Sequence, residues 1–277
     1  MMHAVVHPVS EQLLEAAHIH QPQAVLLFGE EGVGLRTVAK HYFEPKGSIV
    51  LEVLPEKNDT VDIEKGVITV ESIRRLYDTL RTTSAQRRII CIDYAERMGI
   101  PAQNAFLKLL EEPPENTQFI LLSHMERTLL PTVMSRVQAI ELRRTTQEQS
   151  AALLDLLGVA DQKKRTQLLF IASGLPAELT RLVQNEAYFA ARAEMVTDAR
   201  VLVAGSSYDR LLLAKKYKDT RVKALTLLSD AAKQVQLALT KDPSDRMITV
   251  LSKLEAAQVR IVEQGNVRLQ LAALAVF

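Results

Sequence analysis

The sequence lacks most of the residues that cross-link small folds or bind metals. It has one cysteine, Cys91, among 277 residues, which excludes a disulfide framework and a cysteine-rich zinc site. Its six histidines show no ligand spacing with acidic or thiol partners, and it has no tryptophan. We therefore expect no metal site, and a chain with a single thiol fits a reducing compartment.

Long apolar runs and a strong charge of either sign are also missing. No stretch approaches the ~20 apolar residues that a membrane span needs. The first residues do not join a basic segment to an apolar core, so no signal peptide is expected. The net charge of +1 argues against a polybasic wrapper of nucleic acid and against an acidic tail. Because 47% of the residues are apolar, we expect a sizeable core. The missing signal peptide and membrane span predict a soluble, cytoplasmic protein.

The first half of the sequence alternates apolar strands with helices. Five runs are typical of strands, at residues 24–28, 48–53, 88–93, 118–123 and 137–142. Helices are expected around them, at residues 10–18, 37–43, 69–80, 101–112 and 128–135. Ser10 is the expected cap of the first helix, and Pro113 with Pro114 ends the fourth. This alternation predicts an α/β fold with a parallel, doubly wound sheet.

The pattern becomes purely helical after Leu142. Helices are expected at residues 146–158, 161–174 and from 176, and again at residues 211–239, 247–262 and from 266 to the end. Thr146 with Gln149 forms a capping-box pattern, and Gly205-Ser206-Ser207 is the best candidate for a linker. The sequence therefore predicts an α/β domain at residues 1–143, a small helical lid at 144–204 and an all-helical C-terminal domain at 205–277.

A glycine-rich loop follows the first predicted strand, where such loops cradle phosphates with backbone N–H groups. The working motif is Gly-x4-Gly-Lys-Ser/Thr, in which the lysine reaches the outer phosphates and the hydroxyl holds magnesium. Here Leu35 stands at the lysine position and Arg36 at the hydroxyl position. The residues of this degenerate loop are Gly29, Gly32, Gly34, Leu35, Arg36 and Thr37. Two interpretations stay open: a tight strand–helix connection, or a loop with residual nucleotide binding.

The acidic motif that would complete such a site is also incomplete. Asp93 ends the third predicted strand, where an ATPase places an aspartate for the metal ion. Tyr94 stands where a glutamate would activate water, and Glu96 lies further along, on the expected turn. The sequence therefore predicts that this chain does not hydrolyse ATP. The alternative is an active ATPase with a variant loop, in which Arg36 replaces the lysine.

Several segments together resemble the bacterial clamp-loader family of AAA+ proteins. They are residues 93–98, residues 104–114 with the run Leu-Leu-Glu-Glu-Pro-Pro, residues 119–122, and residues 129–136, which end in Ser135-Arg136. The resemblance extends over about residues 10–180. Within the family it is strongest to the delta-prime subunits, which generally lack ATPase activity. It implies an AAA+ α/β module, a small helical lid and an all-α C-terminal collar domain.

The sequence departs from the family pattern at several positions. The degenerate loop separates it from the ATP-hydrolysing gamma/tau subunits. The few residues between Phe43 and Ile49 leave no room for the four-cysteine zinc module that many relatives carry. Val137 replaces the cysteine of the family's Ser-Arg-Cys motif, a change that we expect to be tolerated. Pro176 stands where active members have a nucleotide-sensing arginine, so both the loop and the lid fit a silent nucleotide site.

The resemblance implies a role for Arg136, with Ser135 beside it, as an arginine finger given in trans. A guanidinium offers a planar fork of donors to the charge on a transferring phosphoryl group. The ATP and magnesium would be bound by a neighbouring subunit, so that this chain itself binds no cofactor productively. Spacing alone favours a surface arginine in a solvated ion pair, and the surrounding motif favours the arginine finger.

The resemblance also implies the partners. The chain would belong to a hetero-oligomer with gamma/tau-like and delta-like subunits, joined through its C-terminal helices, within a DNA polymerase III holoenzyme. It would reach the sliding clamp and primed DNA through that complex during DNA replication, with no membrane contact. The remaining alternative is an AAA+-derived interaction scaffold that acts outside replication.

Overall fold

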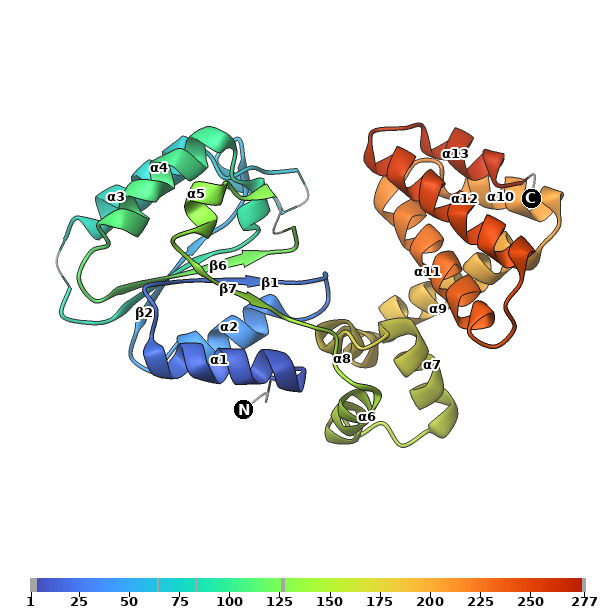
Figure 1. The fold of residues 1–277 in the computed structure, drawn as a ribbon, viewed down its shortest axis with the longest axis horizontal. Coiled ribbons are helices and arrows are strands. Elements are labelled where there is room, and N and C mark those ends of the chain that lie inside the picture. The colour runs from blue at the N-terminus through green and yellow to red at the C-terminus, as the bar shows by residue number, and fades with distance from the viewer. Residues whose placement is uncertain (1–3, 64, 83, 126–127, 276–277) are drawn as a thin grey trace. The chain divides into compact units, whose positions relative to one another are not determined.

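The computed structural model describes residues 4–63, 65–82, 84–125 and 128–275. The chain forms two compact units, residues 1–183 and residues 184–277 (Figure 1). The first unit contains a sheet with flanking helices, and the second is built from helices. Within the described ranges, no helix is both long enough and apolar enough to cross a bilayer.

A five-stranded parallel sheet forms the centre of the first unit. Its strand order is β2-β5-β6-β1-β7, and every neighbouring pair is parallel. The strands are β1 (Ala24–Phe28), β2 (Ile49–Val53), β5 (Arg88–Ile92), β6 (Thr117–Ser123) and β7 (Gln138–Glu141). The five strands that the sequence predicts are confirmed, with each end shifted by at most one residue.

Two groups of helices cover the two faces of this sheet (Figure 1). One face carries α1 (Pro8–His20) and α2 (Leu35–Phe43). The other carries α3 (Val70–Leu80), α4 (Ile100–Glu111) and α5 (Pro131–Met134). The α/β fold class that the alternating pattern predicts is therefore confirmed.

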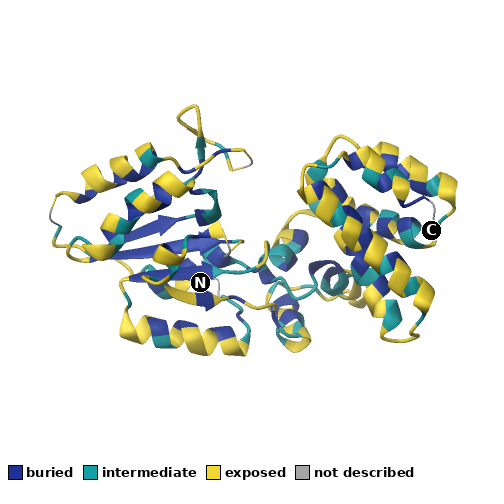
Figure 2. Ribbon diagram, turned by 45° about the horizontal axis from the view of Figure 1, so that its top comes forward, coloured by how far each residue is buried: buried dark blue, intermediate teal, exposed yellow. Residues whose placement is uncertain are grey.

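The strands of this sheet are buried on both sides. Successive side chains of a strand point to opposite faces, so Val25 and Leu27 pack with α1 and α2 whereas Leu26 packs with the other layer. In that other layer the rings of Phe106 and Phe119 meet edge to face, with centroids 5.4 Å apart. Figure 2 shows the central strands largely in dark blue, as expected for a parallel sheet covered on both faces.

The start of α1 differs from the sequence prediction. The sequence predicts Ser10 as the cap, but the helix begins at Pro8 and the side chain of His7 supplies the cap hydrogen bond. Ser10 is fully buried: its hydroxyl donates to the carbonyl of Glu141 (2.7 Å) and accepts from the N–H of Arg143 (3.1 Å). The prediction is wrong because this hydroxyl ties the helix to the end of β7 instead of to its own first turn.

Two short elements also differ from their predictions. The helix expected at residues 128–135 covers only α5, because Leu130 is extended and Pro131 begins the helix, while its end at Ser135 agrees with the prediction. A small hairpin of β3 (Glu56–Lys57) and β4 (Thr60–Val61) was not expected, since strands of two residues are too short to show periodicity.

The predicted lid helices are α6 (Gln147–Leu156), α7 (Gln162–Ala172) and α8 (Pro176–Gln184). The capping box at the start of α6 is confirmed: Thr146 accepts from the N–H of Gln149, whose side chain accepts from the N–H of Thr146. The N–H of Thr145 donates to the carbonyl of Gly174 (2.8 Å), which joins the entry of the lid to the loop before α8. By its contacts the lid belongs to the same compact unit as the sheet.

The second unit packs five described helices around one apolar core. They are α9 (Glu186–Ala204), α10 (Ser207–Tyr217), α11 (Arg221–Leu239), α12 (Asp245–Val262) and α13 (Val267–Ala273). The apolar stretch at residues 211–239 contains two helices, because the chain turns at residues 218–220. Val276 and Phe277, the expected end of the last helix, lie outside the described residues.

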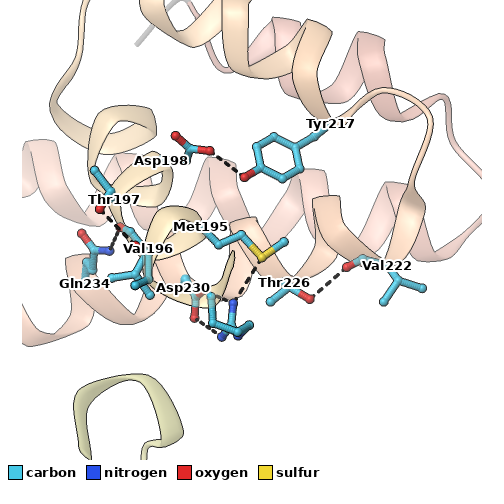
Figure 3. A network of polar contacts seen from close by, with 11 residues as sticks. Met195, Val196, Thr197, Asp198, Tyr217, Val222, Thr226, Asp230 and Gln234 are labelled. Carbon is cyan, nitrogen blue, oxygen red and sulfur yellow. Dashed lines mark hydrogen bonds and ion pairs between the residues drawn. The ribbon is translucent and has the colours of Figure 1, made fainter. Parts of the chain in front are cut away.

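Polar contacts fasten α9 to the other helices of the second unit (Figure 3). The Arg192 guanidinium pairs with the Asp230 carboxylate at 2.9 Å, and both side chains are mostly buried. The Tyr217 hydroxyl donates to the Asp198 carboxylate at 2.6 Å, and burial, followed by that carboxylate, raises the pKa of Tyr217 above its ordinary value. These contacts bind α9 to α10 and α11.

The position of α9 bears on the expected domain boundary at residues 204 and 205. Gly205 ends α9, and Ser206 opens α10 in a capping box with Asp209, so the expected linker is a tight turn inside the second unit. The compact unit starts instead at Gln184, before α9. The division into three functional domains stays a prediction, with α9 grouped structurally with the C-terminal helices.

The pair between Arg192 and Asp230 yields a stability prediction. We expect Asp230→Ala to lower the free energy of unfolding by about 3–5 kcal/mol, because it removes the Asp230 carboxylate from the side of a mostly buried guanidinium. Urea unfolding followed by circular dichroism measures this change. Asp219→Ala, at a carboxylate that is 82% exposed, is the control and should change stability by less than about 0.5 kcal/mol. Equal unfolding curves for the two variants would contradict the prediction.

Candidate functional site

The glycine-rich loop joins the carboxyl end of β1 to the start of α2. The N–H of Gly29 donates to the carbonyl of Ser123 at the end of β6 (3.2 Å), which fixes the start of the loop. Gly32 and Gly34 have φ angles of +91° and +93°, which only glycine adopts without strain. The loop therefore keeps the backbone shape that its glycines predict.

The side chains after the glycines do not suit a triphosphate. Leu35, at the lysine position, is buried in the core beside Val33. Arg36 pairs with Glu44 and Glu52, the second of which lies on β2. Desolvation acts to lower the pKa of Arg36, but hydrogen bonds to these two carboxylates outweigh it and raise the pKa. Arg36 is thus neutralised by carboxylates of its own chain.

The first turn of lid helix α8 contacts the loop directly. The N–H groups of Ala177 and Glu178 both donate to the carbonyl of Gly32, at 2.9 and 3.2 Å. A Cβ on Gly32 would lie 3.1 Å from the Cβ of Glu178, so the two backbones are in close contact. Pro176 begins this helix and is buried. The amides of a helix start, which favour anions, are here satisfied by the loop itself.

A second tie joins the loop to the lid through charge. The guanidinium of Arg144 pairs with Glu30 on the loop, with its Nε 2.8 Å from the carboxylate, and also donates to the carbonyl of Ser173 (3.2 Å). The hydrogen bond from Arg144 lowers the pKa of Glu30. The carboxylates of Glu30 and Glu31 also add negative charge to the segment that would have to surround phosphates.

Asp93 follows β5 at the same edge of the sheet. It is half-buried, and desolvation raises the pKa of its carboxyl, which accepts a hydrogen bond from the N–H of Tyr94 (2.9 Å). Among the described residues, no three histidine, cysteine or acidic side chains are grouped closely enough to hold a metal ion. Asp93 therefore belongs to no such group, although Glu96 lies near enough to add to the rise of its pKa.

His124 is a residue at this edge that the sequence analysis missed. It follows β6, its Nδ1 lies 3.0 Å from the carbonyl of Gly29, and its N–H donates to Glu96 (3.3 Å). Its ring meets the Tyr94 ring edge to face, with centroids 5.8 Å apart. The available signal was its place directly after a buried strand that neighbours β1, since polar residues at the carboxyl ends of adjacent parallel strands converge.

Arg136 lies at the amino ends of the strands, opposite the carboxyl ends where the loop and Asp93 lie. It precedes β7, whose Gln138 pairs with Val25 near the start of β1, whereas the loop follows the end of β1. β1 has five residues, which at ~3.3 Å per residue separates the two edges by about 16 Å. The structure therefore brings Asp93 and the loop together and keeps Arg136 away from both.

The guanidinium of Arg136 is held at that edge by three contacts. Its Nη2 lies 2.8 Å from the carboxylate of Glu111, the last residue of α4. Its Nη1 donates to the carbonyl of Thr132 (2.9 Å) and to the hydroxyl of Ser135 (3.2 Å). The Arg136 side chain remains 37% exposed despite these contacts.

A buried glutamine anchors the segment that carries Arg136. The side-chain amide of Gln103, on α4, donates to the carbonyls of Met98 (2.9 Å) and Thr128 (3.1 Å), and its oxygen accepts from the N–H of Leu130 (2.7 Å). Val137, directly after Arg136, packs against the apolar core.

The fold and the loop define the class of protein. The first unit has the fold of an AAA+ module. Its parallel sheet has this strand order, a glycine-rich loop follows β1, an acidic residue follows β5, and a helical lid lies against the loop. A solved structure of a DNA polymerase III gamma subunit-related protein from Thermotoga maritima shares this fold. It superposes with a TM-score of 0.55 at 22% sequence identity, over 96% of this chain and 97% of that one.

Sequence comparisons identify the family. The family model described as DNA polymerase III, delta subunit, matches residues 51–146. The chain is 30% identical to DNA polymerase III subunit delta' of Pseudomonas aeruginosa over 215 residues, which are 68% of this chain and 62% of that protein. It is 29% identical to DNA polymerase III subunit tau of Bacillus subtilis over 185 residues, 63% of this chain and 32% of that protein. The chain is a member of the bacterial clamp-loader family, and it spans less than two thirds of the length of these relatives.

The geometry of the loop yields a binding prediction. We expect Mg-ATP and Mg-ADP at about 1 mM to leave the thermal midpoint of the isolated chain unchanged, because the loop lacks its lysine and is hydrogen-bonded to α8. A ligand at a hundredfold excess over its Kd would stabilise the folded state by ~2.7 kcal/mol. Differential scanning fluorimetry measures this, with a gamma/tau-like ATPase subunit as the positive control. A rise of several degrees with this chain would contradict the prediction.

The buried glutamine yields a second stability prediction. We expect Gln103→Leu to lower the free energy of unfolding by about 1–3 kcal/mol, because the part-buried N–H of Leu130 and two carbonyls lose the amide of Gln103 as a partner. Chemical unfolding of the variant measures this. Asn104→Ala, at the exposed next position of α4, is the control. If Gln103→Leu unfolded together with this control, the anchoring role would be wrong.

Proposed function

We propose that this chain is a non-catalytic, delta-prime-like subunit of a DNA polymerase III clamp loader, which supplies Arg136 in trans to ATP bound by a neighbouring gamma/tau-like subunit. The observation that carries the proposal is the separation of Arg136 from the loop of its own chain. An arginine about one strand length away from its own phosphate loop can assist hydrolysis only in another subunit.

The state of the chain's own loop supports the non-catalytic part of the proposal. Leu35 is a core residue, Arg36 is already paired with two carboxylates, and Gly32 is bonded to α8. The ATP and magnesium that matter for the reaction would then be held by the neighbour. This chain would act as a fixed element that activates hydrolysis during the loading of the sliding clamp on primed DNA.

The surface of the second unit supports assembly with other subunits. Large apolar side chains are exposed on helices that also line its core, namely Leu211, Leu212, Val222, Val259, Val262 and Leu269. Exposed apolar side chains on a helical domain suit burial against similar domains. Gamma/tau-like and delta-like subunits are the proposed neighbours, in the cytoplasm, and contact with the clamp and DNA would come through the complex.

The rival functions have less support. An active ATPase would need Arg36 to leave Glu44 and Glu52 and turn to the phosphates, and α8 to release the loop. An interaction scaffold outside replication would need no arginine at the edge of the sheet opposite the loop. The clamp-loader role gives Arg136, the silent loop and the helical second unit one common explanation.

The test of the proposal is Arg136→Ala in a clamp loader reconstituted with gamma/tau-like and delta-like subunits. We expect the DNA-stimulated ATPase rate to fall while the complex still assembles, because an arginine finger contributes ~10³–10⁵ in kcat at the site that it serves. Arg136→Lys should restore little, since an ammonium lacks the planar fork of donors. Steady-state ATPase assays and size-exclusion chromatography measure the two properties.

The control is Arg74→Ala, which removes an exposed arginine that pairs only with Glu71 on its own helix α3 in the described contacts. It should leave turnover unchanged. Wild-type turnover of the complex that carries Arg136→Ala would refute the arginine-finger role.

A further inference from the structure

We infer that Glu111 is a positioning residue for Arg136: its carboxylate orients the guanidinium for the triphosphate of the neighbouring subunit. This inference rests on the proposed function. It assigns a role to one of the two glutamates in the Leu-Leu-Glu-Glu-Pro-Pro run and distinguishes it from the other.

The contacts of Arg136 are of two kinds, with residues near it in the sequence and with a residue on another helix. Thr132 and Ser135 lie on or beside α5, within four residues of Arg136, so they move with it. Glu111 lies on a different element, α4, and is the distant partner among the described contacts of this side chain. The Glu111 carboxylate therefore fixes the guanidinium relative to the body of the domain.

The end of α4 is a firm support for this carboxylate. Leu109 and Phe106, in the last turns of the helix, are buried in the core. At the other end of the helix, Gln103 holds the chain that leads into α5. The side chain of Glu111 thus extends from the packed end of α4, and a packed support of this kind is what positioning of a reactive group requires.

Helix energetics give no local reason for a carboxylate at Glu111. It is the last residue of α4, where the helix dipole disfavours negative charge. Glu112 follows as the C-terminal cap residue and adds a second carboxylate there. The pairing with Arg136 compensates the unfavourable position of Glu111, whereas the described contacts of Glu112 include no such cation.

The committed donors leave room for a phosphate. A guanidinium has five N–H donors. The described hydrogen bonds of Arg136 use two of them, for Thr132 and Ser135, and its Nη2 forms the ion pair with Glu111. The remaining donors of this part-exposed side chain are available to a ligand from outside the chain. Glu111 thereby holds one side of the planar group while the other side stays open.

The test compares Glu111→Ala, Glu111→Gln and the matched control Glu112→Ala in the reconstituted complex. We expect Glu111→Ala to lower the ATPase kcat about two- to fivefold, the size of an exposed ion pair, with unchanged KM for ATP, assembly and thermal midpoint. Glu111→Gln should retain part of the rate because its amide oxygen keeps a partial negative charge beside the guanidinium. Glu112→Ala should match the wild-type rate.

A double substitution separates this inference from the proposed function. If Glu111 acts through Arg136, then Glu111→Ala should cause no further loss in a complex that already carries Arg136→Ala. A wild-type or increased rate for Glu111→Ala, or the same loss in both backgrounds, would overturn the positioning role alone. No effect of Arg136→Ala would overturn the proposed function, and this inference with it.

Discussion

The polarity of the parallel sheet is the constraint on which the site depends. Because all strands run the same way, the residues that follow β1, β5 and β6 meet at one edge, and the residues that precede β7 lie at the other. The first edge collects the loop, Asp93 and His124. The second presents Arg136, so the two sets of residues lie apart within this chain.

The glycine-rich loop is joined to the lid by hydrogen bonds and by an ion pair. Two N–H groups at the start of α8 share the carbonyl of Gly32, and the pair between Arg144 and Glu30 joins the same elements. The two ties are local, with a hydrogen bond contributing about 1 kcal/mol and an exposed pair less. These ties matter because of their position: they engage the Gly32 carbonyl and the Glu30 carboxylate, which belong to the glycine-rich loop.

The second unit depends on buried polar pairs as well as on its apolar core. Arg192 with Asp230, and Tyr217 with Asp198, join α9 to its neighbours. Their partners are 38 and 19 residues apart in the chain, so no local pattern announces them. This explains why a boundary drawn at a Gly-Ser turn differs from the boundary of the compact unit. The turn at Gly205 is short and capped, and a linker and a tight turn have the same composition.

The sequence by itself determined the elements whose signal is local. The five apolar runs became strands, Thr146 with Gln149 capped α6, and the glycines of the loop set its backbone, because periodicity, capping and positive φ act within a few residues.

Only the tertiary structure decided the roles of side chains whose partners are distant. Ser10 ties α1 to β7, Gln103 holds the chain before α5, Arg36 pairs with Glu44 and Glu52, and Glu111 meets Arg136. A polar side chain has several possible partners of equal chemistry, and packing selects one of them.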